Sequence, residues 1–318
     1  MKLAQLLLLI FSAFPAPSLP RPLPPRQLLT EGRADDAIRT LQDQVQHHPA
    51  DAESYNLLCR AYFMIDAWDP AIAACDRAIN LDPRNSMYQL WLGRVYGEKA
   101  DHASFLSAAG PARQARNAFE RAVQLDPANW EARVDLAEFY AEAPGIIGGG
   151  KDKARGQADA LMTLNSAMAH WILARVAEKE KHPDIAEREY RAEIADSHSG
   201  ARGWLDLASF FRREKRIDEM EQALHALDSC RVDNPEALMD GAHQLLRENR
   251  DLPFAVGLLR RYLQAPAEAG PAFKAHDLLG QIFEKQGDKL AAAGEYRAAL
   301  ALARSYARAQ ENLKRVGH

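Results

Sequence analysis

The sequence predicts an all-α fold, a solenoid of helix hairpins stacked in one row. The first observation is a repeat: Pro49 and Pro83 close similar phrases 34 residues apart, and Pro127 follows after that period plus an insertion of ten. The second is that the segments between these prolines have apolar residues at helical spacing and no β-branched alternation, which leaves no room for a sheet. A single hairpin cannot bury its apolar faces alone, so the hairpins are expected to stack.

Composition excludes several classes of protein. The 318 residues are 47% hydrophobic and 26% charged, with a net charge of -4. These values exclude wholesale disorder, a collagen-like chain and a disulfide scaffold. The slight acidity argues against a nucleic-acid partner. No run of 18 apolar residues occurs, so the mature chain is expected to have no integral membrane segment.

The amino terminus has the pattern of an export signal. Lys2 precedes an apolar run over 3–14, which is too short to cross a bilayer but suits the core of a signal peptide. The alternative is a buried first helix of a cytosolic solenoid, but six prolines between 15 and 25 would break such a helix. We therefore expect a signal peptide at 1–18, a Pro-rich arm at 19–25, and an exported chain that is periplasmic or secreted.

Residues 26–318 are expected to form about eight hairpins, the first with its leading helix shortened to 26–31. An amphipathic helix over 305–316 is expected to cap the stack. Small residues such as Gly280 fit where the two helices of a hairpin cross, and large ones such as Tyr296 fit between neighbouring hairpins. Three hairpins carry the repeated residues most clearly: Tyr55, Leu58, Cys59, Tyr62, Ala71, Cys75, Ala78 and Pro83; Leu92, Gly93, Tyr96, Ala115, Phe119, Ala122 and Pro127; Leu279, Gly280, Phe283, Gly287, Ala292, Tyr296 and Ala299.

This pattern resembles the tetratricopeptide repeat family, whose signature has W-x2-L-G-x2-Y, then A-x3-F, then a closing Pro. The resemblance covers nearly the whole chain after residue 25. It implies a right-handed superhelix with a concave groove that binds proteins and peptides. The phrases LGRVYGEKA, LDPANWEARVDLAEFY and APGIIGGGKDKA also resemble a subgroup of exported bacterial repeat proteins of unassigned activity.

Two insertions depart from the repeat. The first, 97–112, is interpreted as an extended helix with a turn at Gly110-Pro111, with a docking loop as the alternative. The second, 143–151, contains a G-x4-G-K match over 145–151. A phosphate-binding loop needs a strand before it and Ser or Thr after the lysine. Here a helix is expected before it and Asp152 follows, so a glycine-rich turn between helices is preferred.

Sequence motifs for catalysis or metal binding are missing. No HExxH, no His pair at i, i+4 and no G-x-S-x-G occurs, so we expect no catalytic residue, metal or cofactor. Cys59 and Cys75 fall in one hairpin, either as two buried thiols or as a disulfide in an oxidising compartment. Cys230 takes no part in either arrangement.

The resemblance places the first helix of each repeat along the groove. Arg60, Arg94 and Arg175 on these helices suggest a patchy basic stripe. Such a stripe is expected to bind an acidic peptide, since arginine pairs well with carboxylates. The alternative is local pairing, for example of Arg94 with Glu98. The residues expected to line the groove are Asn56, Arg60, Arg94, Glu138, Arg175, Arg212, His243 and Gln281.

The resulting functional hypothesis is a non-catalytic scaffold that binds a protein or peptide, expected to be acidic, in the cell envelope. Two alternatives stay open. One is a nucleotide-binding or hydrolytic enzyme that uses the glycine-rich loop at 145–151. The other is a purely structural spacer without a groove ligand.

Overall fold

The computed structural model describes residues 23–104, 107–232, 234–268 and 270–317. These ranges contain seventeen α-helices, two short 3-10 helices and no strand, which confirms the all-α prediction. The predicted signal peptide and most of the predicted Pro-rich arm lie outside the described residues. None of the described helices combines the length and the apolar character needed to cross a membrane.

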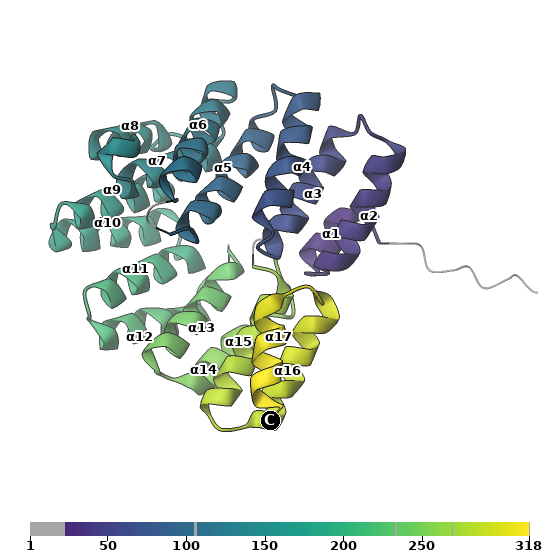
Figure 1. The fold of residues 1–318 in the computed structure, drawn as a ribbon. Helices are drawn as coiled ribbons and strands as arrows, with labels where there is room; N and C mark the ends of the chain where they lie inside the picture. The colour runs from purple at the N-terminus through teal and green to yellow at the C-terminus, as the bar shows by residue number, and fades with distance from the viewer. Residues whose placement is uncertain (1–22, 105–106, 233, 269, 318) are drawn as a thin grey trace, which may run out of the picture.

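The helices pair into eight antiparallel hairpins followed by one single helix, as the repeat count predicts (Figure 1). The pairs are α1 (Pro25–Thr30) with α2 (Ala34–His47), α3 (Ala52–Met64) with α4 (Trp68–Leu81), α5 (Ser86–Asp101) with α6 (Ala109–Leu125), α7 (Trp130–Glu142) with α8 (Lys151–Leu161), α9 (Ser166–Lys179) with α10 (Pro183–Asp196), α11 (Ala201–Arg213) with α12 (Ile217–His225), α13 (Glu236–Glu248) with α14 (Leu252–Tyr262), and α15 (Ala272–Lys285) with α16 (Lys289–Leu302); α17 (Ala307–Val316) follows.

The recurring proline phrases supply the start of the next first helix. Two residues after each of the three closing prolines stands an N-cap: Asp51 for α3, Asn85 for α5 and Asn129 for α7. Each side chain accepts a hydrogen bond from a backbone N–H in the first turn, which would otherwise lack a partner. The proline therefore marks the end of one hairpin, and the polar residue after it fixes where the next begins.

Close helix crossings explain the small residues of the repeat. A Cβ added to Gly93 would lie 2.4 Å from the Phe119 ring, and one added to Gly280 would lie 2.4 Å from the Tyr296 ring. Each large residue thus packs on the glycine of its own hairpin, rather than only between hairpins as expected. Tyr296 is fully buried, and its hydroxyl donates to Glu284 at 2.9 Å.

The row of hairpins curves until its two ends meet (Figure 1). One apolar cluster contains Leu29 and Leu41 from the first hairpin together with Phe273, Ala303 and Tyr306 from the last elements. We call the contacts between residues 28–66 and residues 268–306 the seam. The solenoid is therefore closed into a ring, and α17 helps to join its ends as well as capping α16.

Polar contacts complete the seam. The Asp35 carboxylate accepts hydrogen bonds from the backbone N–H of Arg304 at 2.5 Å and the hydroxyl of Ser305 at 2.6 Å. Gly32 has a φ of +70°, and a Cβ there would lie 2.8 Å from the backbone nitrogen of Ala272. Glycine is required at this point both by the left-handed backbone and by the close approach of the other end of the chain.

Both insertions extend the hairpins without adding a separate unit. In the first, α5 runs on to Asp101 as expected, but the predicted turn at Gly110-Pro111 is wrong, because both residues lie in the first turn of α6. In the second, a 3-10 helix, η1 (Gly145–Ile147), joins α7 to α8. Gly148 turns the chain with a φ of +100°.

Candidate binding hollow

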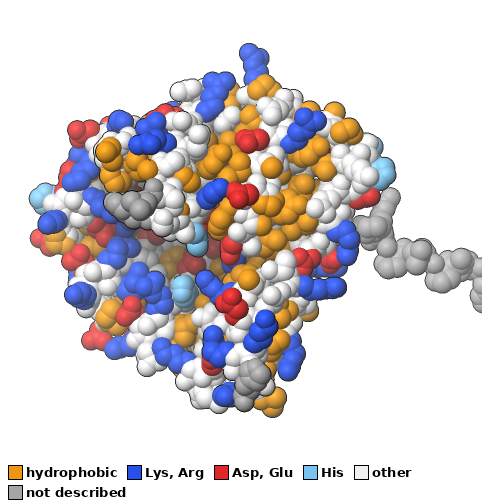
Figure 2. Space-filling view, viewed as in Figure 1, with side chains coloured by type: hydrophobic (Ala, Val, Ile, Leu, Met, Phe, Trp, Pro, Cys, Tyr) orange, Lys and Arg blue, Asp and Glu red, His pale blue; other side chains and the backbone are white. Residues whose placement is uncertain are grey.

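The ring surrounds a hollow that the first helices of the hairpins line. Figure 2 shows this face of the molecule hollowed near its centre, with charged and histidine side chains around the opening. Glu138 of α7 and Asp240 of α13 both have exposed side chains. Burial in the hollow raises the pKa of both carboxylates, and the positive charge of Arg202, on α11, offsets part of the rise in each. Side chains from three separate first helices therefore face the same enclosed space.

The arginines of the predicted stripe are held by carboxylates. Arg60 pairs with Glu268, its Nε lying 2.5 Å from Oε1. Arg94 pairs with Asp135 at 2.6 Å and with Glu131 at 3.0 Å, rather than with Glu98 as the alternative suggested.

A tryptophan and further carboxylates hold the stripe in place. Both Arg60 and Arg94 lie about 5 Å from the ring of Trp91, within the range of cation–π attraction. Arg175 pairs with Glu142 and, at 3.2 Å, with Glu178. The basic stripe is thus neutralised by carboxylates of the same chain. The alternative of intramolecular pairing predicted this outcome, although it named a different partner for Arg94.

An acidic stripe runs along α7 and was only partly recognised from the sequence. Glu131, Asp135, Glu138 and Glu142 follow the i, i+4, i+7, i+11 spacing that places residues on one helix face. Burial within the crowded hollow raises the pKa of Glu138 to about 7, and the negative charge of Asp135 adds to this effect. Only Glu138 was named in advance, although the spacing of all four was visible.

The acidic surface continues on α13. Burial and the neighbouring Glu236 carboxylate raise the pKa of Asp240 to about 6. Arg202 pairs with Asp206 at 3.3 Å and also balances part of the charge of Glu138 and Asp240. Opposing charges are therefore fewer than carboxylates in this part of the hollow.

The far half of α13 has the opposite sign. Burial and the positive charges of Arg247, Arg308 and Arg212 lower the pKa of His243. The Arg212 guanidinium lies 3.8 Å from Glu248, and its Nε is buried without a hydrogen-bond partner. We call Arg212, His243, Arg247 and Arg308 the cationic patch. It contains the two predicted residues Arg212 and His243 and two that were missed.

The two amide residues of the prediction lie elsewhere. Asn56 is 3% exposed, so its side chain belongs to the interior of the hairpin stack and not to the groove surface, which corrects the prediction. Gln281 donates to Asp277 at 2.8 Å, and the buried Asp277 also accepts from Asn312 of α17 at 2.8 Å. Gln281 thus takes part in docking the capping helix.

The glycine-rich loop lacks the features of a phosphate cradle. The element before it is helix α7, not a strand. The amides of Ile147, Gly148 and Gly149 donate to carbonyls within the connection, and that of Gly150 donates to Tyr140 of α7 at 2.8 Å. Asp152 lies in the first turn of α8, where the helix dipole favours it. The preferred interpretation as a turn fits this geometry, and its amides are not free to hold a phosphate.

An isoleucine at the start of the loop is exposed, although its apolar side chain suits a buried position. Ile146 is 86% exposed and does not pack against the neighbouring helices. Arg116 donates to the carbonyl of Ile147 at 2.9 Å, and Lys153 donates to that of Gly148 at 2.9 Å. The loop is fixed by these bonds from both sides.

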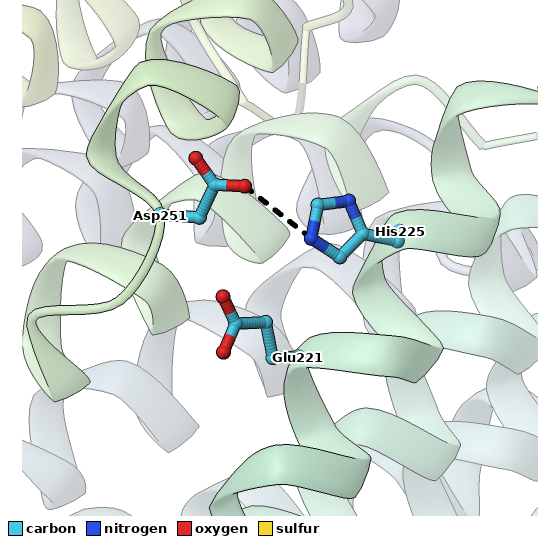
Figure 3. A group of neighbouring side chains, drawn as sticks. All are labelled: Glu221, His225 and Asp251. Atoms are coloured by element: carbon cyan, nitrogen blue, oxygen red, sulfur yellow. Dashed lines mark ion pairs between the residues drawn. The ribbon is translucent and has the colours of Figure 1, made fainter.

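A three-residue group with metal-ligand chemistry lies between α12 and the start of α14 (Figure 3). Ligand atoms of Glu221, His225 and Asp251 lie within 4.8 Å of one another. The sequence did not indicate this group, because it contains one histidine and no metal-binding motif. Each member has a structural contact: Glu221 accepts from Arg250 at 2.6 Å, His225 stacks on Phe254, and Asp251 caps α14.

The two cysteines of the second hairpin are joined. Cys59 of α3 and Cys75 of α4 form a disulfide, with Cα atoms 5.2 Å apart. Of the two possibilities left open by the sequence, the bridge is the one observed. Cys230 is not in a disulfide.

Comparison with known proteins agrees with this architecture. The sequence profile of the tetratricopeptide repeat matches residues 28–94. Yeast Tom70 is similar in structure, with 16% identity over 89% of this chain and 58% of that chain and a TM-score of 0.54. No curated protein sequence matches.

Two bacterial structures are also similar. A thermophilic tetratricopeptide-repeat protein of Thermus thermophilus shares 19% identity over 59% of this chain and 97% of that chain, with a TM-score of 0.49. A tetratricopeptide-repeat protein of Parabacteroides merdae shares 15% identity over 92% and 96%, with a TM-score of 0.46. The fold and the profile match define a helical repeat scaffold. Residues 28–94 match the tetratricopeptide repeat, and the described residues share the fold of helix-hairpin solenoids.

Proposed function

We propose that this chain is a non-catalytic scaffold that holds a segment of a partner protein in its central hollow. The observation that carries the proposal is a set of charged side chains that face the hollow without an ion pair or hydrogen bond to the described residues. Glu138, Asp240 and Arg247 are of this kind, and Arg247 acts on His243 of the same helix. Charged groups in such a space are stabilised when a complementary partner enters, because opposite charges favour the ionised forms.

The acidic character proposed for the partner is supported by the cationic patch. Burial and the positive charge of Arg247 lower the pKa of Arg212, and the Arg212 guanidinium lies 3.8 Å from Glu248. A carboxylate placed between the two guanidinium groups would relieve this repulsion and accept paired hydrogen bonds. Arg60, Arg94 and Arg175 give no such support, because intramolecular carboxylates already hold them.

A peptide titration tests this proposal. The probe is a short fluorescein-labelled peptide of alternating Glu and Ala, with a Ser and Ala peptide as the neutral control. We expect binding of the acidic peptide to weaken about tenfold in Arg212→Met/Arg247→Met. The matched control, Arg121→Met/Arg297→Met, removes two exposed arginines from second helices and should bind as the parent does. Equal loss in both variants, or no binding preference for the acidic peptide, contradicts an acidic partner at this patch.

The cell envelope remains the proposed location. The export pattern of the amino terminus supports it, and so does the Cys59–Cys75 disulfide, because disulfides persist mainly in oxidising compartments. Mass spectrometry of the chain from fractionated bacterial cells tests this point. We expect an amino terminus near residue 19 in the envelope fraction, whereas an intact Met1 in the cytosolic fraction contradicts export.

A further inference from the structure

Exposed apolar side chains gather at one mouth of the hollow. Trp130, Met162 and Leu164 are each about 40% exposed and line a cavity of about 700 Å³. Met87 is exposed to a similar degree and lies beside them, its sulfur 3.5 Å from the side-chain nitrogen of Asn129. Large apolar side chains that are exposed together mark a contact surface more often than the same residues scattered singly.

Two charged residues of the cavity lining belong to the electrostatic surroundings of the acidic part of the hollow. Arg202 and Glu236 line the cavity. The same Arg202 balances part of the charge of Glu138 and Asp240, and Glu236 raises the pKa of Asp240 through its negative charge. A segment that enters past Trp130 therefore meets carboxylates as it goes deeper.

The charges identify the occupant. Arg202 is shared among several carboxylates, including its own ion-pair partner Asp206. Glu138 and Asp240 have no ion pair of their own among the described residues, and both have pKa values raised by burial. A cationic group between them would stabilise their ionised forms, whereas a further carboxylate would be repelled.

We propose that this cavity binds a partner segment in which lysine or arginine stands beside large apolar residues. The apolar side chains pack on Trp130, Met162 and Leu164, and the cationic group reaches Glu138 and Asp240. The inference rests on the proposed function of the hollow, but it concerns the opposite end from the cationic patch. A partner that used both ends would carry basic-apolar and acidic stretches in one segment.

The test uses the full chain and a labelled peptide of alternating Leu and Lys. Two further peptides replace either every Lys by Glu or every Leu by Ser. We expect the Leu and Lys peptide to bind best, and its affinity to fall at least tenfold in Glu138→Gln/Asp240→Asn. The matched control, Asp159→Asn/Asp184→Asn, changes the net charge equally on second helices and should leave affinity within about twofold of the parent. Thermal melting verifies that each variant is folded.

A third variant separates the apolar contribution from the charge. Trp130→Ala/Leu164→Ala should weaken the Leu and Lys peptide and leave the Ser and Lys peptide unchanged. The inference is overturned if Glu138→Gln/Asp240→Asn and its control lose affinity equally, or if the Glu-substituted peptide binds at the same mouth as well. Continued binding of the acidic probe at Arg212 and Arg247 would then show that the proposed function survives. Loss of all peptide binding would end both.

Discussion

Arg60 and Glu268 form an ion pair across 208 residues of sequence, with the Arg60 Nε 2.5 Å from the carboxylate. Both side chains are only 17% exposed. With Lys274 and Asp66, 3.3 Å apart, this pair spans the seam that closes the solenoid. The closed ring turns an open groove into a hollow with two mouths, and this explains why exposed carboxylates inside it are still poorly solvated.

The seam should depend on Gly32. Replacing Gly32 with Ala places a Cβ 2.8 Å from the Ala272 nitrogen and forces a left-handed backbone on a non-glycine residue. We expect Gly32→Ala to lower the free energy of unfolding by about 1–2 kcal/mol. Small-angle scattering should show a larger radius of gyration because the ends separate. Gly287→Ala is the control, since it has a similar positive φ but no atom within 4 Å. Equal effects in the two variants would show that backbone strain, not the seam, is responsible.

The crossing of α15 and α16 should be intolerant of a methyl group. Gly280→Ala would bring its Cβ 2.4 Å from the Tyr296 ring, which is fully buried and cannot move freely. We expect a loss of about 1–3 kcal/mol in urea unfolding. Gly294→Ala lies in the same hairpin on an exposed face with nothing nearby, and should stabilise by up to about 1 kcal/mol. The same sign in both variants contradicts the packing argument.

The disulfide should stabilise the second hairpin. Cys59 and Cys75 are 16 residues apart, and closing a loop of this size stabilises by about 3 kcal/mol in the chain-entropy description. Chemical unfolding with and without reductant should therefore show a lower midpoint for the reduced chain. Cys59→Ser/Cys75→Ser should unfold like the reduced parent and no longer respond to reductant. A parent midpoint that reductant leaves unchanged would show that the bridge does not form or does not stabilise.

Stability should vary with pH through Glu138. Its pKa is raised to about 7 in the folded chain from an ordinary value near 4.5, so the folded state binds a proton more tightly than the unfolded state. Stability from this group is therefore fully present below pH 4.5 and is lost as the pH rises to 7 and above.

The matched variant removes this dependence. Glu138→Gln should stabilise the chain by about 1 kcal/mol at pH 8, a value reduced because water reaches the side chain, and by nothing at pH 4.5. Asp159→Asn, on the exposed face of α8, should show no such difference between the two pH values. Thermal melting at both pH values measures this, and a Glu138→Gln effect that is the same at both contradicts the assigned environment.

Local sequence signals were enough to predict the hairpins. The proline phrases place the N-caps Asp51, Asn85 and Asn129, and Gly93 and Gly280 mark helix crossings, all within one repeat length. These features depend on residues near in sequence. They can therefore be predicted from one sequence. Ring closure cannot, because it depends on small rotations between neighbouring hairpins that add up over the whole row.

The pairing of charges was harder to predict. Glu98, on the same helix, was the local ion-pair partner considered for Arg94. The partners in the structure, Glu131 and Asp135, lie on the first helix of the next hairpin. Arg60 meets Glu268 only because the ring closes. Contacts between first helices are set by the superhelix, so a stripe of arginines in sequence does not predict a basic surface.

The central claim is that the hollow is the working surface of this chain. Photocrosslinking in the cells that produce the protein tests this claim. One variant carries a photoreactive amino acid at position 243, inside the hollow, and a second variant carries it at position 159, on the exposed face of α8. We expect a discrete protein adduct from position 243 that disappears when Glu138, Asp240, Arg212 and Arg247 are neutralised, and none from position 159. Adducts from position 159 alone, or adducts from 243 that persist in the neutralised variant, would contradict the claim.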